Sequence, residues 1–441
     1  MKTLARSTIL FAIACAAGAC GTEGDSSSIT SLAATCDSVT PWANGTHYAV
    51  GAVVTFDGQT YQCIQAHTSQ LDWTPPVVPA LWGIADCDGG GDGGDGGDGT
   101  GDDGGGDGTG DDGGGDGTGD DGGGGDGGGV ADGFILSAYK DTSINMDFNT
   151  NVISTTVPGA RTPLADDLAA NGGGPITLAF ATGECGTENW GGVQGAAIAQ
   201  ANVPRLTSAG IDYILSTGGA AGSFTCGSDA GFSTFINRWL SPNLIGVDFD
   251  IEVGQSQAAI VNLVRRIDAA HGAHPGLRFS LTIATLANTD GSESLNATGV
   301  ATLQAVTTVF GSSVPSFVTI NLMTMDYGGP SQFVCVVANG TCDMGQSAAQ
   351  AARNLHDRHG IPFGNIELTP MIGGNDVQSN VFHPADVNTL ATFAAQNGIA
   401  GVHFWSYDRD VDCPPGPASP VCNSHGGVGA HGFLHRFQSA L

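Results

Sequence analysis

From residue 133 onward, the chain alternates between short apolar runs and longer segments of helical composition, such as Ser256–Ala270 and Pro384–Gln396. Nearly continuous apolar strands that alternate with helices indicate a parallel sheet covered on both faces. Eight repeats of this unit over residues 133–441 predict an α/β fold, a (β/α)8 barrel, with its chemistry at the carboxyl ends of the strands. The predicted strands are Phe134–Ala138, Ile176–Ala181, Tyr213–Leu215, Leu244–Ile251, Arg278–Ala284, Phe317–Met323, Ile366–Met371 and Val402–Trp405.

Residues 36–87 have a different pattern, in which two alternating runs, Ala52–Phe56 and Thr60–Ile64, flank Asp57-Gly58. This arrangement predicts a β-hairpin within a small all-β module. The module is also rich in Trp and Tyr, and a domain of this size cannot bury every ring. Exposed rings suit the flat apolar faces of sugars. The rings are those of Trp42, Tyr48, Tyr61, Trp73 and Trp82.

Between these two regions, residues 88–132 consist almost entirely of Gly and Asp. The stretch Asp88–Gly129 contains 26 Gly, 13 Asp and 3 Thr, and it has no apolar residue that could be buried. We therefore expect a flexible, self-repelling linker. The nine-residue spacing of its Thr residues also occurs in calcium-binding Gly/Asp rolls, but such rolls need an apolar residue in each repeat. Weak, nonspecific cation binding by the linker remains an open alternative.

The charge of the chain narrows the class of partner. With 13 Lys and Arg against 43 Asp and Glu, the formal net charge is −30. So few cations form no basic stripe, which argues against nucleic acid and against an anionic membrane surface. A neutral or cationic substrate fits this charge better.

The N-terminus has the pattern of an export signal over residues 1–19. Lys2 and Arg6 precede an apolar stretch, Thr8–Ala17, that is too short to span a bilayer. Cys20, which follows this signal, makes the segment resemble a bacterial lipoprotein signal. The resemblance implies that Cys20 carries lipid, that residues 20–35 form a tether, and that the lipid is the one attachment to a membrane. We expect an exported protein, either extracellular or anchored to the outer membrane.

Cysteine usage agrees with export, because an oxidising compartment favours disulfides. Cys36 and Cys87 bracket the small module, two pairs are close enough in sequence to close single loops, and a fourth pair follows by elimination. Cys63 is expected to be buried as a small apolar residue. No Cys or His set has zinc-like spacing, so we expect no metal site. We also expect a chain that needs no organic cofactor and is a monomer. The predicted disulfides are Cys36–Cys87, Cys185–Cys226, Cys335–Cys342 and Cys413–Cys422.

The fourth predicted strand ends in three acids with a period of two: Asp248, Asp250 and Glu252. Because alternate side chains of a strand point to opposite faces, the acids share one side, and the apolar residues between them share the other. In a barrel the apolar set faces the helices, so the acids enter the interior. Crowding and burial must raise the pKa of at least one of them, as a general acid requires. The alternative is an exposed strand with an acidic face.

This strand resembles the DGxDxDxE signature of glycoside hydrolase family 18, the chitinases, with Ile245 in place of the first Asp. Three further motifs resemble the same family: Ser216-x-Gly218-Gly219 on the third strand, Met323–Tyr327 on the sixth and Trp405 on the eighth. Within the sixth-strand motif, Met325 stands where many members have a Tyr. The order Trp42, Tyr48, Gly58, Tyr61, Trp73 and Trp82 in the small module resembles carbohydrate-binding module families 5 and 12, which bind chitin.

The family 18 resemblance implies a retaining, substrate-assisted hydrolysis of chitin. Glu252 is the acid, Asp250 polarises the substrate's acetamido group, and Asp248 shares the proton of Asp250. Asp326 and Tyr327 orient the acetamido group, with Tyr327 supplying the phenol that Met325 cannot. Trp405 lies under the reactive sugar. The implied partners are chitin and N-acetylglucosamine oligomers.

The module resemblance implies that Trp73 lies on the chitin surface and that Trp42 and Trp82 belong to the core, while Tyr61 fits either place. In the barrel, the short segment between Met371 and Val402 predicts a shallow cleft and endo action. Three other readings remain: a chitin-binding lectin, an endo-N-acetylglucosaminidase acting on glycoproteins, and a structural envelope protein. Further candidate groove contacts, equally compatible with structural roles, are Tyr139, Asp141, Glu184, Asn375, Asp376 and Tyr407.

Overall fold

The computed structural model describes residues 39–49, 51–63, 67–69, 74–75, 82–84, 133–252 and 255–441. These residues form two compact units, one on each side of residue 113. Several sequence predictions lie outside the described residues: the export signal, the lipidation of Cys20, the Cys36–Cys87 disulfide, Trp73 and the linker over residues 88–132.

The N-terminal unit contains the predicted hairpin. Strands β3 (Val53–Phe56) and β4 (Gln59–Cys63) pair antiparallel across Asp57-Gly58. Both turn residues have positive φ, 48° and 81°, as the tight turn of a twisted hairpin requires. The hairpin joins β1 (Thr40–Pro41) and β6 (Trp82–Ile84) in one sheet, and β2 (His47–Tyr48) pairs with β5 (His67–Thr68).

The core of this unit confirms part of the aromatic assignment. Trp82 is buried and Trp42 packs against the same cluster, as predicted for core rings. Tyr61 is half-buried on the edge of the cluster. Cys63 is buried, also as predicted.

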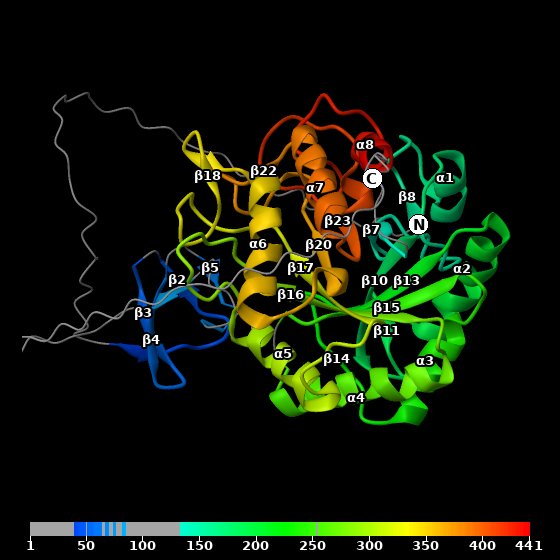
Figure 1. Ribbon diagram of the computed structural model, residues 1–441, viewed down its shortest axis with the longest axis horizontal. Helices are drawn as coiled ribbons and strands as arrows, with labels where there is room; N and C mark the ends of the chain where they lie inside the picture. Colours follow the sequence, from blue (N-terminus) through cyan, green and yellow to red (C-terminus); the bar gives the residue numbers. More distant parts are fainter. Residues whose placement is uncertain are drawn as a thin grey trace, which may run out of the picture. The chain divides into compact units, whose positions relative to one another are not determined.

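The C-terminal unit is the predicted barrel, visible in Figure 1 as a ring of strands surrounded by helices. Within the described residues, eight parallel strands pair in chain order, and the last pairs with the first to close the ring. Each predicted apolar run corresponds to one strand. The strands are β7 (Ile135–Asp141), β10 (Ile176–Glu184), β13 (Tyr213–Gly218), β15 (Leu244–Asp250), β16 (Arg278–Ala284), β17 (Val318–Met323), β20 (Ile366–Thr369) and β23 (Gly401–Trp405).

The helices begin and end where local chemistry favours it. Ser228, Ser256, Asn296 and Asp343 each accept a hydrogen bond from a first-turn N–H of the helix that follows. Three helices end at a glycine in the left-handed conformation. The helices are α1 (Leu164–Ala170), α2 (Gly195–Ala209), α3 (Asp229–Trp239), α4 (Gln257–Ala273), α5 (Ala297–Phe310), α6 (Met344–His359), α7 (Pro384–Asn397) and α8 (Gly432–Ala440). Among the described residues, no helix is long and apolar enough to cross a bilayer.

The outer face of strand β15 explains why its acids point inward. Val247, Phe249 and Ile251 are buried, and the ring of Phe249 contacts that of Phe232 on α3, with centroids 5.8 Å apart. Because this apolar face packs against a helix, the alternate side chains must enter the barrel.

Short hairpins lie in the strand-to-helix loops. They pair β8 (Ser154–Thr155) with β9 (Thr162–Pro163) and β18 (Val337–Ala338) with β19 (Thr341–Cys342), and β21 (Gly373–Gly374) with β22 (Val381–Phe382). Strands β11 (Asn189–Trp190) and β12 (Val193–Gln194) extend the sheet beyond β10. Between β20 and β23, the chain forms one such hairpin and helix α7 and no further domain, as the segment length predicted.

Three of the predicted disulfides are present. Cys185–Cys226, Cys335–Cys342 and Cys413–Cys422 have Cα–Cα distances of 4.9, 5.6 and 5.7 Å. Each closes a loop of the barrel unit, where a cross-link stabilises the folded chain by restricting the unfolded one.

Candidate active site

The acid row lies at the carboxyl end of strand β15, inside the barrel. Asp248 and Asp250 are 1% and 5% exposed, and Glu252 follows two residues later, half-buried at the rim. The alternative of an exposed acidic strand is therefore wrong. Ser216 and Gly218 of β13 lie beside Asp248 and Asp250 on one side, and Ser280 and Thr282 of β16 on the other.

Asp248 is surrounded by hydroxyl donors. Its Oδ1 accepts hydrogen bonds from Ser280 and Thr282, each at 2.6 Å, and its Oδ2 accepts from Ser216 at 2.6 Å and Tyr139 at 3.0 Å. Four donors satisfy both oxygens of this buried carboxyl group. Asp248 is thus held in one position beneath the other two acids.

Asp250 and Glu252 form a hydrogen-bonded pair above Asp248. Burial, the Glu252 charge and the Asp248 charge all raise the pKa of Asp250 well above its ordinary value. Burial also raises the pKa of Glu252, to about 6, although hydrogen bonds from Ala220 and Asp250 oppose the shift. The sequence predicted that Asp250 shares its proton with Asp248, whereas the structure pairs it with Glu252. Asp250 Oδ1 is buried and makes no hydrogen bond with any described residue.

The two glycines of the third-strand motif allow β13 to approach the acid strand closely. Gly218 has a φ of 87°, and a Cβ at this position would collide with the carbonyl oxygen of Asp250. Gly219 has a φ of 81°, donates its N–H to the same carbonyl at 3.1 Å and lies under the ring of Phe180. Any side chain here would displace the acid row or the ring.

The loop after β17 brings Asp326 and Tyr327 to the same end of the barrel. Asp326 adopts a φ of 52°, and its Oδ1 accepts a hydrogen bond from the N–H of Val377 at 2.8 Å. Burial raises the pKa of Asp326. The hydroxyl of Tyr327 is buried and forms no hydrogen bond of ordinary geometry with a described residue, and burial raises its pKa. Met325, in the same loop, is half-buried.

Trp405 ends strand β23 as part of an aromatic group. Its half-buried ring stacks on Phe180, with centroids 5.7 Å apart and planes at 23°, and lies 6.2 Å from the ring of Tyr139. The sequence motifs did not include Phe180, because it lies within an ordinary apolar strand run. A platform of this kind suits the apolar face of a sugar ring.

Three of the residues left open to either groove or structural roles are buried. Tyr139 is 3% exposed and donates to Asp248, Asn375 is 0% exposed and accepts from the N–H of Asp326 at 3.2 Å, and Tyr407 donates to Asp167 at 2.8 Å. Their polar groups form hydrogen bonds within the barrel interior and the loops, so these residues have a structural role in the site.

The other candidates remain near the surface. Asp376 is exposed, Asp141 is half-buried and accepts from Ser143, and Glu184 is exposed and accepts from Thr225 and Gly227. Of these three, Asp376 is the one with an electrostatic effect on an acid of the site, since its charge raises the pKa of Asp326.

A pocket of about 290 Å³ lies away from the acids and is lined by residues of β7, β10, α1 and α8, including Leu136, Leu168 and Leu434. Among the described residues, no group of three or more His, Cys, Asp or Glu side chains is arranged to hold a metal ion.

Comparisons with known proteins agree with both resemblances. Residues 41–83 match the model of carbohydrate-binding module family 5/12. A segment of 41 residues is 66% identical to Streptogrisin-C of Streptomyces griseus, covering 9% of each chain. A longer match, to Endochitinase 11 of Metarhizium anisopliae, has 28% identity over 306 residues and covers 63% of this chain and 53% of that protein. The chain thus spans about half or less of the length of these relatives.

The fold of the barrel unit has solved counterparts. The catalytic domain of a hyperthermophilic chitinase from Pyrococcus furiosus superposes with a TM-score of 0.54 at 23% identity. The likeness covers 70% of this chain and 94% of that domain. It confirms the (β/α)8 fold predicted from the sequence.

Proposed function

We propose that the chain is an exported, endo-acting chitinase of glycoside hydrolase family 18. The observation that carries this proposal is the pair formed by Asp250 and Glu252. A carboxyl group with a pKa of about 6 retains a proton near neutrality and can act as a general acid. It stands at the carboxyl end of a barrel strand, where enzymes of this fold perform their chemistry.

The environment of the acids favours a nucleophile supplied by the substrate. Both oxygens of Asp248 accept hydrogen bonds from hydroxyl groups. Asp250 forms a hydrogen bond with Glu252, and the pKa of Asp250 is raised. Asp248 therefore has no free oxygen, and the raised pKa of Asp250 disfavours its ionised form, so neither suits the role of nucleophile in the two-carboxylate retaining mechanism. The acetamido oxygen of an N-acetylglucosamine unit can perform this attack instead.

In the proposed reaction, Glu252 protonates the glycosidic oxygen while the acetamido carbonyl oxygen forms a bond to the anomeric carbon. The leaving sugar departs with the proton, and an oxazolinium ion remains. Asp250 accepts a hydrogen bond from the acetamido N–H. Glu252, now ionised, removes a proton from water as the water oxygen bonds to the anomeric carbon. The bond between that carbon and the acetamido oxygen breaks, which opens the oxazolinium ring and restores the acid.

Two polar atoms of the site support an acetamido group as ligand. Asp250 Oδ1 is buried and makes no hydrogen bond with a described residue, and the buried Tyr327 hydroxyl interacts with the side chain of Thr324. An acetamido group offers one acceptor and one donor, which matches a phenol O–H and a carboxylate oxygen. Unpaired buried polar atoms are costly, so a ligand that pairs them gains affinity.

Endo action is supported by the single hairpin and helix between β20 and β23, which leave the cleft without an added wall. The product pattern tests this point. Oligomers of several lengths at the earliest times support endo action, whereas chitobiose alone contradicts it.

The test of the function is release of soluble N-acetylglucosamine oligomers from colloidal chitin by the full chain, beside Glu252→Gln. Release by the wild-type protein and not by the variant, with equal chitin binding by both, supports the proposal. Binding without release by the wild-type protein contradicts it and favours a lectin. Cleavage of N-glycoproteins without release from chitin favours the endo-N-acetylglucosaminidase.

Export and lipid attachment form a separate part of the proposal. The signal-like residues 1–19 and Cys20 support it. Expression of the full chain in a Gram-negative host should give a lipid-labelled protein in the membrane fraction, and Cys20→Ser should lose the label. An unlabelled wild-type protein contradicts the anchor without affecting the proposed catalysis.

A further inference from the structure

Arg409 is a buried cation behind the loop that carries the candidate residue Asp326. It ends the short helix Tyr407–Arg409, directly after strand β23, and is 1% exposed. One amino group donates to the carbonyls of Ile372 at 2.9 Å and Gly374 at 2.5 Å, and the other donates to the carbonyl of Ser419. The guanidinium therefore joins strand β21 to the loop that follows β23.

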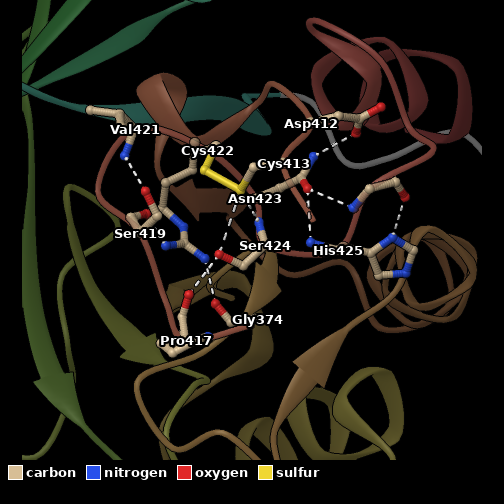
Figure 2. Close-up of a disulfide and its surroundings, with 12 residues drawn as sticks. Gly374, Asp412, Cys413, Pro417, Ser419, Val421, Cys422, Asn423, Ser424 and His425 are labelled. Atoms are coloured by element: carbon tan, nitrogen blue, oxygen red, sulfur yellow. Dashed lines mark hydrogen bonds between the residues drawn. A yellow bond between two sulfur atoms is a disulfide. The ribbon is translucent and has the colours of Figure 1, made fainter. Parts of the chain in front are cut away.

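That loop is held by the Cys413–Cys422 disulfide, shown with its surroundings in Figure 2. Gly374 donates its N–H to the carbonyl of Asn423 at 2.9 Å. A Cβ on Gly373 would collide with the same carbonyl. Strand β21 is thus clamped between the cross-linked loop and Arg409, with no space for a side chain.

From the opposite side, strand β21 leads to Asp326. The side chain of Asn375, the next residue, donates to the carbonyls of Met371 at 2.9 Å and Gly373 at 3.1 Å, and it accepts from the N–H of Asp326. Val377 donates to the Asp326 carboxylate. Because Asp326 has a positive φ, its conformation depends on these contacts from the following loop.

The charges reinforce this geometry. Burial raises the pKa of Asp326, the neighbouring Asp376 raises it further, and the positive charge of Arg409 lowers it. Burial lowers the pKa of Arg409 to about 10, so the guanidinium is still charged at neutral pH. These two carboxylates and one cation are the charged groups that act on one another here.

We propose that Arg409 is a positioning residue for Asp326, which it fixes through strand β21 while its positive charge stabilises the Asp326 carboxylate. This role rests on the proposed function, in which Asp326 orients the acetamido group. Arg409 touches no reacting atom, so its effect must pass through the backbone contacts and the charge.

The pH dependence of kcat on the N-acetylglucosamine tetramer separates the two contributions. In Arg409→Met, we expect kcat to fall about 100-fold because Asp326 is misplaced. We also expect the acidic limb of the kcat–pH profile to move up by about one pH unit, because Asp326 loses the nearby positive charge. Arg409→Lys should restore the limb but not the full rate, and Asp376→Asn should move the limb downward. Arg266→Met, which breaks an ion pair with Asp229 between α4 and α3, is the control and should change neither.

A double-mutant cycle on the thermal unfolding of the full chain tests the contact without activity. The loss of Tm in the double mutant Arg409→Met/Asp326→Asn should differ from the sum of the two single losses by about 2 °C or more. In the control double mutant Arg266→Met/Asp326→Asn, the loss of Tm should equal the sum of the single losses. An additive Arg409 cycle, or an Arg409→Met enzyme with an unmoved acidic limb, overturns the proposal. If the wild-type protein cleaves no oligomer but the cycle shows coupling, the proposed function fails while the positioning contact stands.

Discussion

Replacing Glu252 by Gln should stabilise the protein above pH 6 as well as remove its activity. Burial raises the pKa of Glu252 from 4.5 to about 6, so the folded chain keeps a proton that the unfolded chain has already lost. The free energy of unfolding must therefore fall as pH rises from 4.5 to about 6, and stay level beyond it. The difference between the two pKa values corresponds to about 2 kcal/mol. Glutamine is neutral at every pH and avoids this loss.

The assay is thermal unfolding of the full chain, wild type beside Glu252→Gln, at pH 4 and pH 8. For a unit of this size, a gain of about 2 kcal/mol raises Tm by about 3 °C. We expect this gain at pH 8 and nearly equal Tm values at pH 4. Glu252→Gln also removes the negative charge that raises the pKa of the neighbouring Asp250, and this change should increase the stability of the folded chain at pH 8 as well.

Glu293→Gln provides a control of opposite sign. Burial tends to raise the pKa of Glu293, but hydrogen bonds from Leu295, His359 and Arg358 hold it at about 2. The ionised Glu293 side chain stabilises the folded chain above its ordinary pKa, and this stabilisation is lost as pH falls. The Glu293→Gln variant should therefore be less stable than wild type at pH 8. If Glu252→Gln is no more stable than wild type at pH 8 while the control behaves as expected, the reasoning about Glu252 is refuted.

Three further outcomes follow from the same structure. The kcat of oligomer hydrolysis should fall above pH 6, as Glu252 loses its proton; a rate that still rises at pH 9 would contradict this. Thr282→Val removes a hydroxyl donor from Asp248 and should cost about 1–3 kcal/mol of unfolding free energy in urea titration, whereas the exposed Thr308→Val should change it by less than about 0.5 kcal/mol. Phe333, 58% exposed on the loop after β17, should contact the polymer, so Phe333→Ala should slow hydrolysis of insoluble chitin and leave tetramer hydrolysis unchanged; equal slowing of both would exclude that contact.

The barrel could be predicted because each strand is buried on its outer face by the helices. Val247, Phe249 and Ile251 alternate with the acids, and this pattern indicates both the strand and the direction of its polar side chains. The two-residue strands β18, β19, β21 and β22 are too short to show such an alternating pattern in the sequence. Their pairing depends on loop contacts such as that of Gly374 with Asn423, which no local sequence pattern encodes.

The acid row could be predicted, but its surroundings could not. Ser280 and Thr282 are ordinary members of a strand, and strand register places their hydroxyls on Asp248. The sequence left Tyr139 and Asn375 open to either a groove contact or a structural role. Their side chains turned out to satisfy Asp248 and the Asp326 backbone, since burial leaves few other donors and acceptors for these groups.

The distribution of satisfied and unsatisfied polar groups provides an argument for substrate selectivity. Asp248 is saturated by hydroxyls, whereas Asp250 Oδ1 has no partner among the described residues. Under the proposed function, the N–H of an acetamido group would pair this oxygen, but a glucose polymer, which carries a hydroxyl at that carbon, would lack both this N–H and the attacking carbonyl. Sites built to hydrogen-bond one group reject analogues without it by about 10⁴–10⁵-fold. We therefore expect hydrolysis of the N-acetylated polymer and not of a glucose polymer, and equal release of sugars from both would contradict the proposed role of Asp250.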